Sequence, residues 1–284
     1  MNNVISRRIS LSSLLRGCTH ILFIGLCFIW IYPFLWMVSS SFKTDREFFA
    51  NRLSLIPETL NTSNFIRAWD TANFSQYFLN SFLITAGVVL IVIVTTSACG
   101  YALGRYSFPG KKLIFVILIC SMFIPLEFSI IPIAVLINAL GLSNSLFGVI
   151  LAESGGGSVM LIMLFAGFFS QIPKELEESA TIDGSGFLRT YVSIMLPLSK
   201  PIIGSAAIMQ TVWTWNSFLL PLVLTLSNPS IRPLAVGIYA FRGENVVDWT
   251  GIAAGATISI IPVIVVFLFL QRYFIEGISG AVKG

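Results

Sequence analysis

The sequence predicts an all-α membrane protein with six transmembrane helices and a cytoplasmic helix-turn-helix loop. Hydrophobic residues make up 56% of the chain and charged residues only 11%, and the mean hydropathy is +0.88. These values lie outside the range of an average soluble domain. A helix needs roughly 20 apolar residues to cross a hydrocarbon core of about 30 Å. Six runs meet that need, at about 21–42, 78–103, 113–138, 146–170, 202–227 and 252–274.

The first run is expected to stay in the protein rather than to be removed as a signal peptide. It is longer than a signal-peptide core, it contains Trp30, Pro33 and Trp36, and no small-residue cleavage site follows it. The sequence therefore predicts a cytoplasmic N-terminus at 1–20, a transmembrane domain at 21–274 and a cytoplasmic tail at 275–284.

The orientation follows from the basic residues, which stay preferentially on the cytoplasmic side of a membrane. Both termini and the 171–200 loop are predicted to be cytoplasmic, because this arrangement places most of the 17 Lys and Arg residues inside. The outer loop at 43–77 is long enough to form short helices at the membrane surface. The net charge of +4 is explained by this bias and indicates no nucleic-acid partner. The residues on the predicted inner side are Arg7, Arg8, Arg16, Arg105, Lys111, Lys112, Lys174, Arg189, Lys200, Arg272 and Lys283.

The chain offers little of the chemistry that an enzyme needs. The cysteines Cys18, Cys27, Cys99 and Cys120 have no paired spacing and are expected to be small buried hydrophobes. The single histidine, His20, is expected at the membrane interface. No metal-binding or nucleophile motif occurs. We therefore expect no catalytic residue, no metal site and no enzyme activity.

Two stretches resemble nucleotide-binding motifs but fail as such. "GRYSFPGKK" has the wrong glycine spacing for a phosphate loop, and Lys112 stands where Mg²⁺ binding needs Ser or Thr. It is better interpreted as a turn between two spans. "ESGGGS" lies within an apolar run without a surrounding α/β pattern. The chain is therefore expected to bind no cofactor and no ATP itself.

Carboxylates within the spans are the first candidates for a solute pathway, because such groups usually face a bundle interior or a watery cavity. Glu127 lies between two prolines, and a structural hydrogen-bonding role is its alternative. Glu153 and Ser154 begin a glycine-rich stretch that includes Gly156. Three consecutive glycines favour an unwound segment lining a solute cavity over close packing alone.

Aromatic and amide side chains within the fifth run extend this pathway hypothesis. Trp213, Trp215 and Asn216 offer stacking and hydrogen bonding to a sugar ring, although interface packing explains them equally well. Gly100 and Gly104, four residues apart, permit close helix approach, for which packing within the chain is the expected use.

The acidic stretch "KELEESATIDGSG" predicts the first half of the cytoplasmic loop. Pro173 suits the start of a helix, the glutamates that follow suit its positive N-terminal end, and Gly184 suits a left-handed stop. A second helix is expected to begin near Ser185 and to end at Pro197. Its partly apolar face fits either the groove of another protein or the membrane surface. That face is expected to comprise Phe187, Tyr191 and Ile194.

This loop resembles a known family element. "IPKELEESATIDGSGFLRTYVSIMLPLSKP" is similar to the EAA loop of permease subunits of binding-protein-dependent ABC importers, with Ser179 in place of the usual second alanine. The resemblance implies the fold of an ABC type I importer and a loop that docks on a separate ATPase subunit, which uses the ATP. The matching positions are Glu178, Ala180, Asp183, Gly184 and Pro197.

Further stretches, including "IYPFLWMVSSSFK", "WTWNSFLLPLVL" and "QRYFIEGISGAVKG", narrow the resemblance to the carbohydrate-type permeases of the maltose and glycerol-phosphate group. It implies import of a sugar or sugar-like solute across the bacterial inner membrane. The implied partners are a homologous second permease, two ATPase subunits and an extracytoplasmic solute-binding protein. The alternatives are an ion-coupled secondary transporter and a membrane enzyme. The solute stays open between a disaccharide, an oligosaccharide, a polyol and glycerol phosphate.

Overall fold

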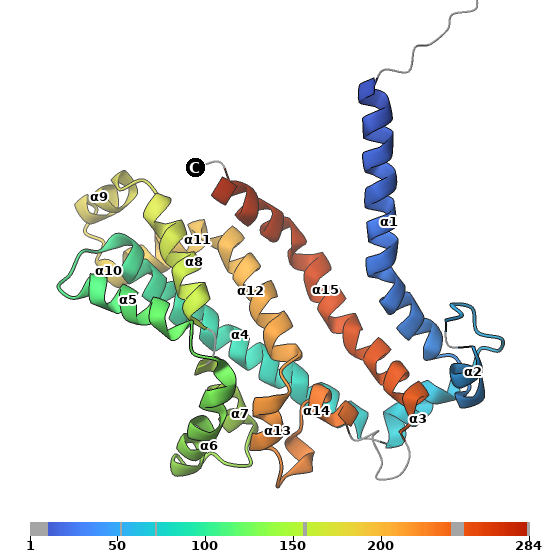
Figure 1. Cartoon of the computed structure of the whole chain (residues 1–284). Coiled ribbons are helices and arrows are strands. Elements are labelled where there is room, and N and C mark those ends of the chain that lie inside the picture. Colours follow the sequence, from blue (N-terminus) through green and yellow to red (C-terminus); the bar gives the residue numbers. More distant parts are fainter. Residues whose placement is uncertain (1–10, 52, 72, 156–157, 240–246, 283–284) are drawn as a thin grey trace, which may run out of the picture. The chain divides into compact units, whose positions relative to one another are not determined.

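The regular elements of the computed structural model are all helices among the residues that it describes (Figure 1), which confirms the predicted all-α class. The chain divides into two compact units. Unit 1 holds residues 1–68 and 243–258, and unit 2 holds residues 69–242 and 259–284. The described residues are 11–51, 53–71, 73–155, 158–239 and 247–282.

Unit 1 contains the first long helix and most of the predicted outer loop, up to Ala68. The loop does form short helices, and a buried cation closes it: Lys43 is fully buried, and its ammonium donates to the carbonyl oxygens of Asn51 (3.2 Å) and Ser54 (2.6 Å). Arg67 forms an ion pair with Asp248, with 2.7 Å between Nε and Oδ2. Helices α3 and α15 continue into unit 2. The helices of this part are α1 (Leu11–Ser40), α2 (Asp45–Ala50), α3 (Ser63–Thr71) and the start of α15 (Trp249–Val282).

Unit 2 is built around α4 (Phe74–Arg105), which packs against α7, α8 and α12. Apolar side chains of these helices form a buried core that includes Val88, Val92, Leu161 and Phe165. The remaining elements are α5 (Lys111–Ser121), η1 (Leu126–Ser129), α6 (Ile130–Ala139), α7 (Leu146–Gly155), α8 (Ser158–Gln171), α9 (Glu175–Ile182), α10 (Phe187–Thr190), η2 (Tyr191–Met195), α11 (Leu196–Leu198), α12 (Lys200–Trp215), α13 (Leu219–Leu224), η3 (Pro229–Ile231) and α14 (Leu234–Ile238).

The Gly100 and Gly104 pair lets α4 and α8 approach each other closely. A Cβ built at Gly104 would lie 2.6 Å from the carbonyl oxygen of Ala166, and one built at Gly100 would overlap the Cβ of Phe165. Real Cβ atoms do not approach so closely, so glycine is required at both positions. The expectation of packing within the chain is confirmed.

Among the described residues, three helices are long and apolar enough to cross a membrane, and up to six spans result if each of three bent helix pairs counts as one. The continuous spans are Arg16–Ser40, Phe74–Arg105 and Trp249–Tyr273. The predicted fifth run contains a break: α12 ends at Trp215, and α13 begins at Leu219. The bent pair in this part of the chain is Phe187–Leu198 with Lys200–Trp215, at 78°. Apolar composition marks the segments but carries no information about breaks within them.

The four cysteines are unpaired and exposed, so the expectation that they are buried was wrong. Lipid tails are as apolar as protein interiors, so an apolar side chain of a span need not face other protein. Hydrophobicity in a span therefore does not predict burial within the chain.

Candidate functional site

Helix α9, at the start of the 171–200 loop, forms because its ends carry suitable residues. Its first turn contains acidic side chains, which the positive helix N-terminus stabilises. Its end is a left-handed turn at Gly184, where φ is +76°. The Gly184 N–H donates to the Thr181 carbonyl (3.0 Å), and the Ser185 N–H donates to the Ala180 carbonyl (2.8 Å). This pair of bonds is a Schellman motif, so the predicted glycine stop is confirmed.

The second half of the loop differs from the prediction at its end. Gly186 precedes α10, and a π-helical turn over Tyr191–Met195 continues into α11. Pro197 does not end this helix but lies in the first turn of α11, which extends to Leu198.

A buried ion pair ties α9 to the end of α4. The Arg105 guanidinium lies 2.8 Å from a Glu177 carboxylate oxygen, and the two side chains are only 3% and 20% exposed. Tyr101 donates to the other carboxylate oxygen at 2.8 Å. Arg105 also donates to the main-chain carbonyls of Phe169, Ile172 and Pro173 at the end of α8. One arginine therefore joins α4, α8 and α9.

Aromatic rings attach the second half of the loop to the same end of α4. The Tyr101 ring stacks on Tyr191, with centroids 5.2 Å apart, and it also contacts Phe187 and Phe169. The Tyr191 hydroxyl lies 2.7 Å from the Ser97 hydroxyl. Part of the apolar face predicted to need a partner is thus used within the chain.

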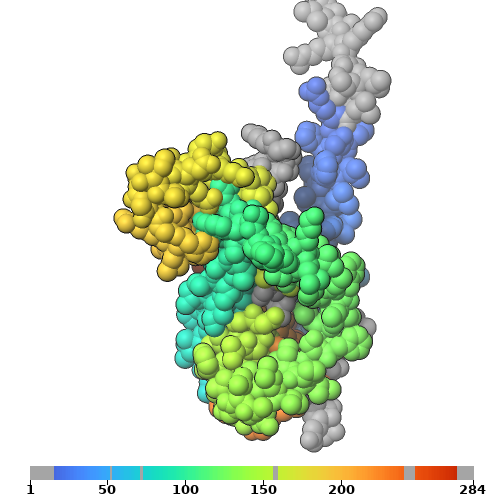
Figure 2. Space-filling model, turned by 90° about the vertical axis from the view of Figure 1, so that its left-hand side faces the viewer, coloured from blue at the N-terminus to red at the C-terminus, as the bar shows by residue number. Residues whose placement is uncertain are grey.

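Other side chains of the loop remain at the surface, where Figure 2 shows the loop in yellow as a separate lobe. Ile182 is 86% exposed, and Leu188 and Val192 are also exposed. The exposed residues among those predicted for coupling are Glu178, Ser179, Asp183, Gly184 and Pro197, whereas Ala180 is buried beneath them. The loop therefore combines a fixed inner side with a partly apolar, acidic outer side.

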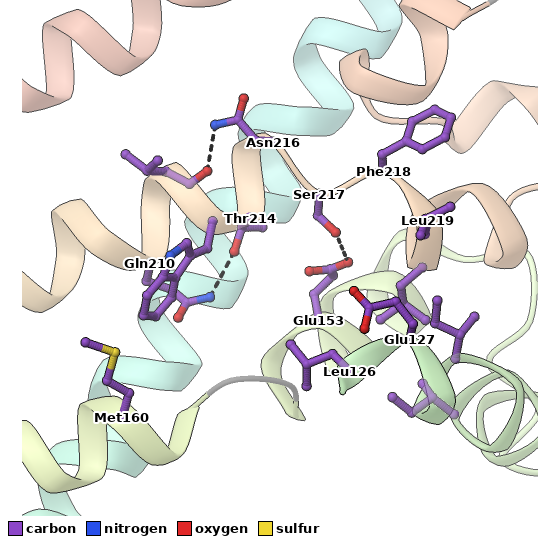
Figure 3. A pocket seen from close by; sticks show the side chains of 15 residues that line it. Leu126, Glu127, Glu153, Met160, Gln210, Thr214, Asn216, Ser217, Phe218 and Leu219 are labelled. Carbon is purple, nitrogen blue, oxygen red and sulfur yellow. Dashed lines mark hydrogen bonds between the residues drawn. The ribbon is translucent and has the colours of Figure 1, made fainter. Parts of the chain in front are cut away.

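A cavity of about 650 Å³ opens elsewhere in unit 2, between η1, α6, α7, α8, α12 and the segment that leads into α13 (Figure 3). It brings together four of the residues predicted for a solute pathway: Glu127, Glu153, Trp213 and Asn216. The complete lining is Leu126, Glu127, Ile130, Ile133, Glu153, Met160, Gln210, Val212, Trp213, Thr214, Asn216, Ser217, Phe218, Leu219 and Leu220.

Polar side chains of the cavity are oriented by local hydrogen bonds, which Figure 3 shows as dashed lines. Ser217 donates to a Glu153 carboxylate oxygen at 2.7 Å. The Gln210 amide nitrogen donates to the Thr214 hydroxyl at 3.0 Å. The Asn216 amide nitrogen donates to the Val212 carbonyl at 2.8 Å. These bonds hold the side chains in place beside an otherwise apolar wall.

Two predicted pathway residues are not brought to the cavity. The Trp215 indole nitrogen donates to the Ser259 carbonyl of α15 at 3.0 Å, and its ring packs against Phe78. Ser154 donates to the Ile150 carbonyl within its own helix at 2.7 Å and does not line the cavity. Gly156 lies outside the described residues. Packing within the chain accounts for the position of Trp215.

Gln210, Thr214 and Ser217 were missed as cavity residues, although a signal was present for the first two. Residues three, four and seven positions apart share a helix face. Gln210, Trp213 and Thr214 follow that spacing within α12, whereas Ser217 lies beyond the end of this helix at Trp215. This spacing indicates Gln210 and Thr214 beside Trp213, but it does not indicate Val212 or Ser217, which also line the cavity.

Comparison with known proteins shows which family the chain belongs to. Residues 96–280 match the family model described as "Binding-protein-dependent transport system inner membrane component". The chain is 35% identical to the probable ABC transporter permease protein YurM of Bacillus subtilis, over 89% of this chain and 84% of the relative. It is 30% identical to the diacetylchitobiose uptake system permease protein NgcG of Streptomyces coelicolor, over 92% and 86% of the two chains. It is 32% identical to the melibiose/raffinose/stachyose import permease protein MelC of Bacillus subtilis, over 98% and 97%.

A solved structure shares the fold. A chain of a bacterial ABC transporter involved in the import of the acidic polysaccharide alginate superposes with a TM-score of 0.81. At 24% sequence identity, the match covers 93% of this chain and 98% of that chain. The protein therefore belongs to the family of inner membrane components of binding-protein-dependent transport systems and is a permease subunit of an ATP-driven importer.

Proposed function

We propose that this chain forms half of the membrane pathway for a sugar or sugar-like solute and that its 171–200 loop couples the pathway to a separate ATPase subunit. Relatives named for diacetylchitobiose uptake and for melibiose, raffinose and stachyose import support the solute class. Because the chain belongs to a family of ATP-driven importers, we favour this function over that of an ion-coupled secondary transporter.

One observation supports the coupling role above all others: the two sides of α9 have different surroundings. On the inner side, Glu177 is held by Arg105 and Tyr101 of α4. On the outer side, Glu178, Ile182 and Asp183 are exposed. A partner that moves α9 by its outer side would therefore pull on the end of α4. Since α4 packs against α7, α8 and α12, such a pull reaches helices that line the cavity.

The exposed outer side fits a protein partner better than lipid. Ile182 and Leu188 supply apolar contact area, but Glu178 and Asp183 flank it with negative charge. Burying these carboxylates in a bilayer would be costly. A protein groove with an apolar floor and a basic rim can accept both the apolar side chains and the carboxylates. This supports an ATPase cleft as the occupant.

The remaining parts of the proposal concern assembly and orientation. A homologous second permease would complete the pathway, two ATPase subunits would bind and hydrolyse ATP, and an extracytoplasmic solute-binding protein would deliver the solute. Both termini and the 171–200 loop would be cytoplasmic, and this chain would bind no cofactor. The family itself implies ATPase and binding-protein partners.

Co-purification of the ATPase with this chain tests the coupling role, followed by solute-stimulated ATP hydrolysis in reconstituted complex. Melibiose, raffinose and diacetylchitobiose are suitable first solutes, given the named relatives. Glu178→Lys and Gly184→Pro should abolish stimulation while leaving membrane insertion intact, because both changes lie outside the spans. Wild-type stimulation in both variants would contradict the assignment of this loop.

A further inference from the structure

We propose that Glu127, Glu153 and Gln210 form a subsite in the cavity that accepts hydrogen bonds from hydroxyl-rich solutes and excludes anions. The inference rests on the proposed function, because it takes the cavity as part of the solute pathway. It goes beyond that function in specifying the charge of the solute. Among the solutes left open by the sequence, it favours neutral sugars and polyols over glycerol phosphate and acidic sugars.

Gln210 provides the observation that points to a ligand. Its side chain is only 3% exposed, yet it lines the cavity. Its amide nitrogen donates to the Thr214 hydroxyl. Its oxygen, Oε1, is buried and has no hydrogen-bond partner among the described residues. A buried acceptor without a partner is costly, so a donor within the cavity is expected to complete it.

The two carboxylates provide further acceptors on the same cavity wall. Glu153 accepts from Ser217 through Oε1, and Figure 3 shows its second oxygen pointing into the cavity. Glu127 lies on η1 at the cavity edge and is exposed. Carboxylates within a membrane normally face water or a polar ligand rather than lipid. Two neighbouring hydroxyl groups of a sugar ring are suited to donate to one carboxylate, and an ammonium group would donate equally well.

The rest of the lining offers nothing to an anion. The described residues that line the cavity include no Lys, Arg or His. The Asn216 amide nitrogen is already engaged by a main-chain carbonyl. Trp213, which is 41% exposed, supplies an aromatic surface beside the acceptors. A cleft with walls of low dielectric and one sign of charge concentrates cations and repels anions.

The charge of the cavity can be measured without knowing the solute. The native cysteines are replaced by serine, and Leu219→Cys introduces one thiol in the cavity lining. Its modification rate is measured in permeabilised membranes with two methanethiosulfonates, one carrying trimethylammonium and the other sulfonate. Ser107→Cys, in the exposed turn beside Arg105 and Lys111, is the matched control. Asn216→Cys repeats the measurement at a second lining position.

The cationic reagent should react with Leu219→Cys at least roughly tenfold faster than the anionic one, relative to the control. Glu127→Gln and Glu153→Gln should each reduce this preference, and the double variant should abolish it. Equal rates at both cavity positions would overturn the inference, even if the assembled complex transports sugars. A clear cation preference without uptake of melibiose, raffinose or diacetylchitobiose would instead count against the proposed sugar import and leave the anion-excluding cavity standing.

Discussion

Removal of the Glu177 carboxylate should release α9 from α4 without unfolding the membrane helices. Glu177 accepts from Tyr101 at 2.8 Å and from the Arg105 Nε at 2.9 Å, and a second guanidinium nitrogen lies at 2.8 Å. Glu177→Ala removes all of these contacts and leaves the 3% exposed Arg105 without its counter-ion. The neighbouring main-chain carbonyls still hold the guanidinium in place.

The size of the effect follows from the burial of the pair. Removing one partner of a buried ion pair costs about 3–5 kcal/mol. The Glu177 side chain is 20% exposed, so water replaces part of the interaction, and we expect about 3 kcal/mol. Since 1.4 kcal/mol corresponds to a factor of ten, local opening of α9 should become roughly 100-fold more frequent.

Hydrogen exchange of a peptide covering 175–186, measured in the purified permease, reports this opening directly. Glu175→Ala is the matched control, because Glu175 lies in the same helical turn but is exposed. It should lose only the helix-dipole contribution of about 0.3–1 kcal/mol. Glu177→Gln, which keeps the size and an acceptor oxygen, should fall between the two. Exchange in Glu177→Ala no faster than in Glu175→Ala would refute the idea that this ion pair anchors α9.

Three further predictions concern the loop, the packing of α4 and the orientation. Gly184→Ala should lower the free energy of unfolding by about 1–2 kcal/mol, because φ is +76° at this position. Gly186→Ala should lower it much less, because φ is −79° there and the space around it is open. Thermal unfolding in detergent compares the two variants. Gly100→Val should destabilise the α4–α8 contact by about 1–3 kcal/mol. Gly167→Ala should not, because the space around Gly167 is open. Equal melting temperatures of the two variants would contradict the close packing of α4 against α8 at Gly100. A cysteine at Ser185, in a cysteine-free background, should react with impermeant reagents only from the cytoplasmic side; labelling in intact cells would reverse the proposed orientation.

Local sequence patterns predicted the elements whose cause is itself local. The long apolar runs predicted the helical class, because a chain in lipid must satisfy its main-chain groups within each segment. The stop of α9 at Gly184 followed from one residue that can adopt a positive φ without strain. Glu127, Glu153, Trp213 and Asn216 were recognised as pathway candidates because polar and aromatic groups are unusual in an apolar span, and all four line the cavity.

The tertiary structure alone decided what depends on residues distant in the sequence. Arg105 and Glu177 are 72 positions apart. The sequence around either residue does not indicate that the two meet, because an arginine or a glutamate at these positions would also suit an exposed surface. The packing of Trp215 against α15 and the orphaned oxygen of Gln210 likewise appear only when separate helices are assembled. Composition and periodicity thus determined that this chain is a bundle of apolar helices with an acidic loop. The packing of those helices decided which polar groups are tied together and which are left facing a cavity, because the partner of a buried polar group is set by the fold and not by its neighbours in sequence.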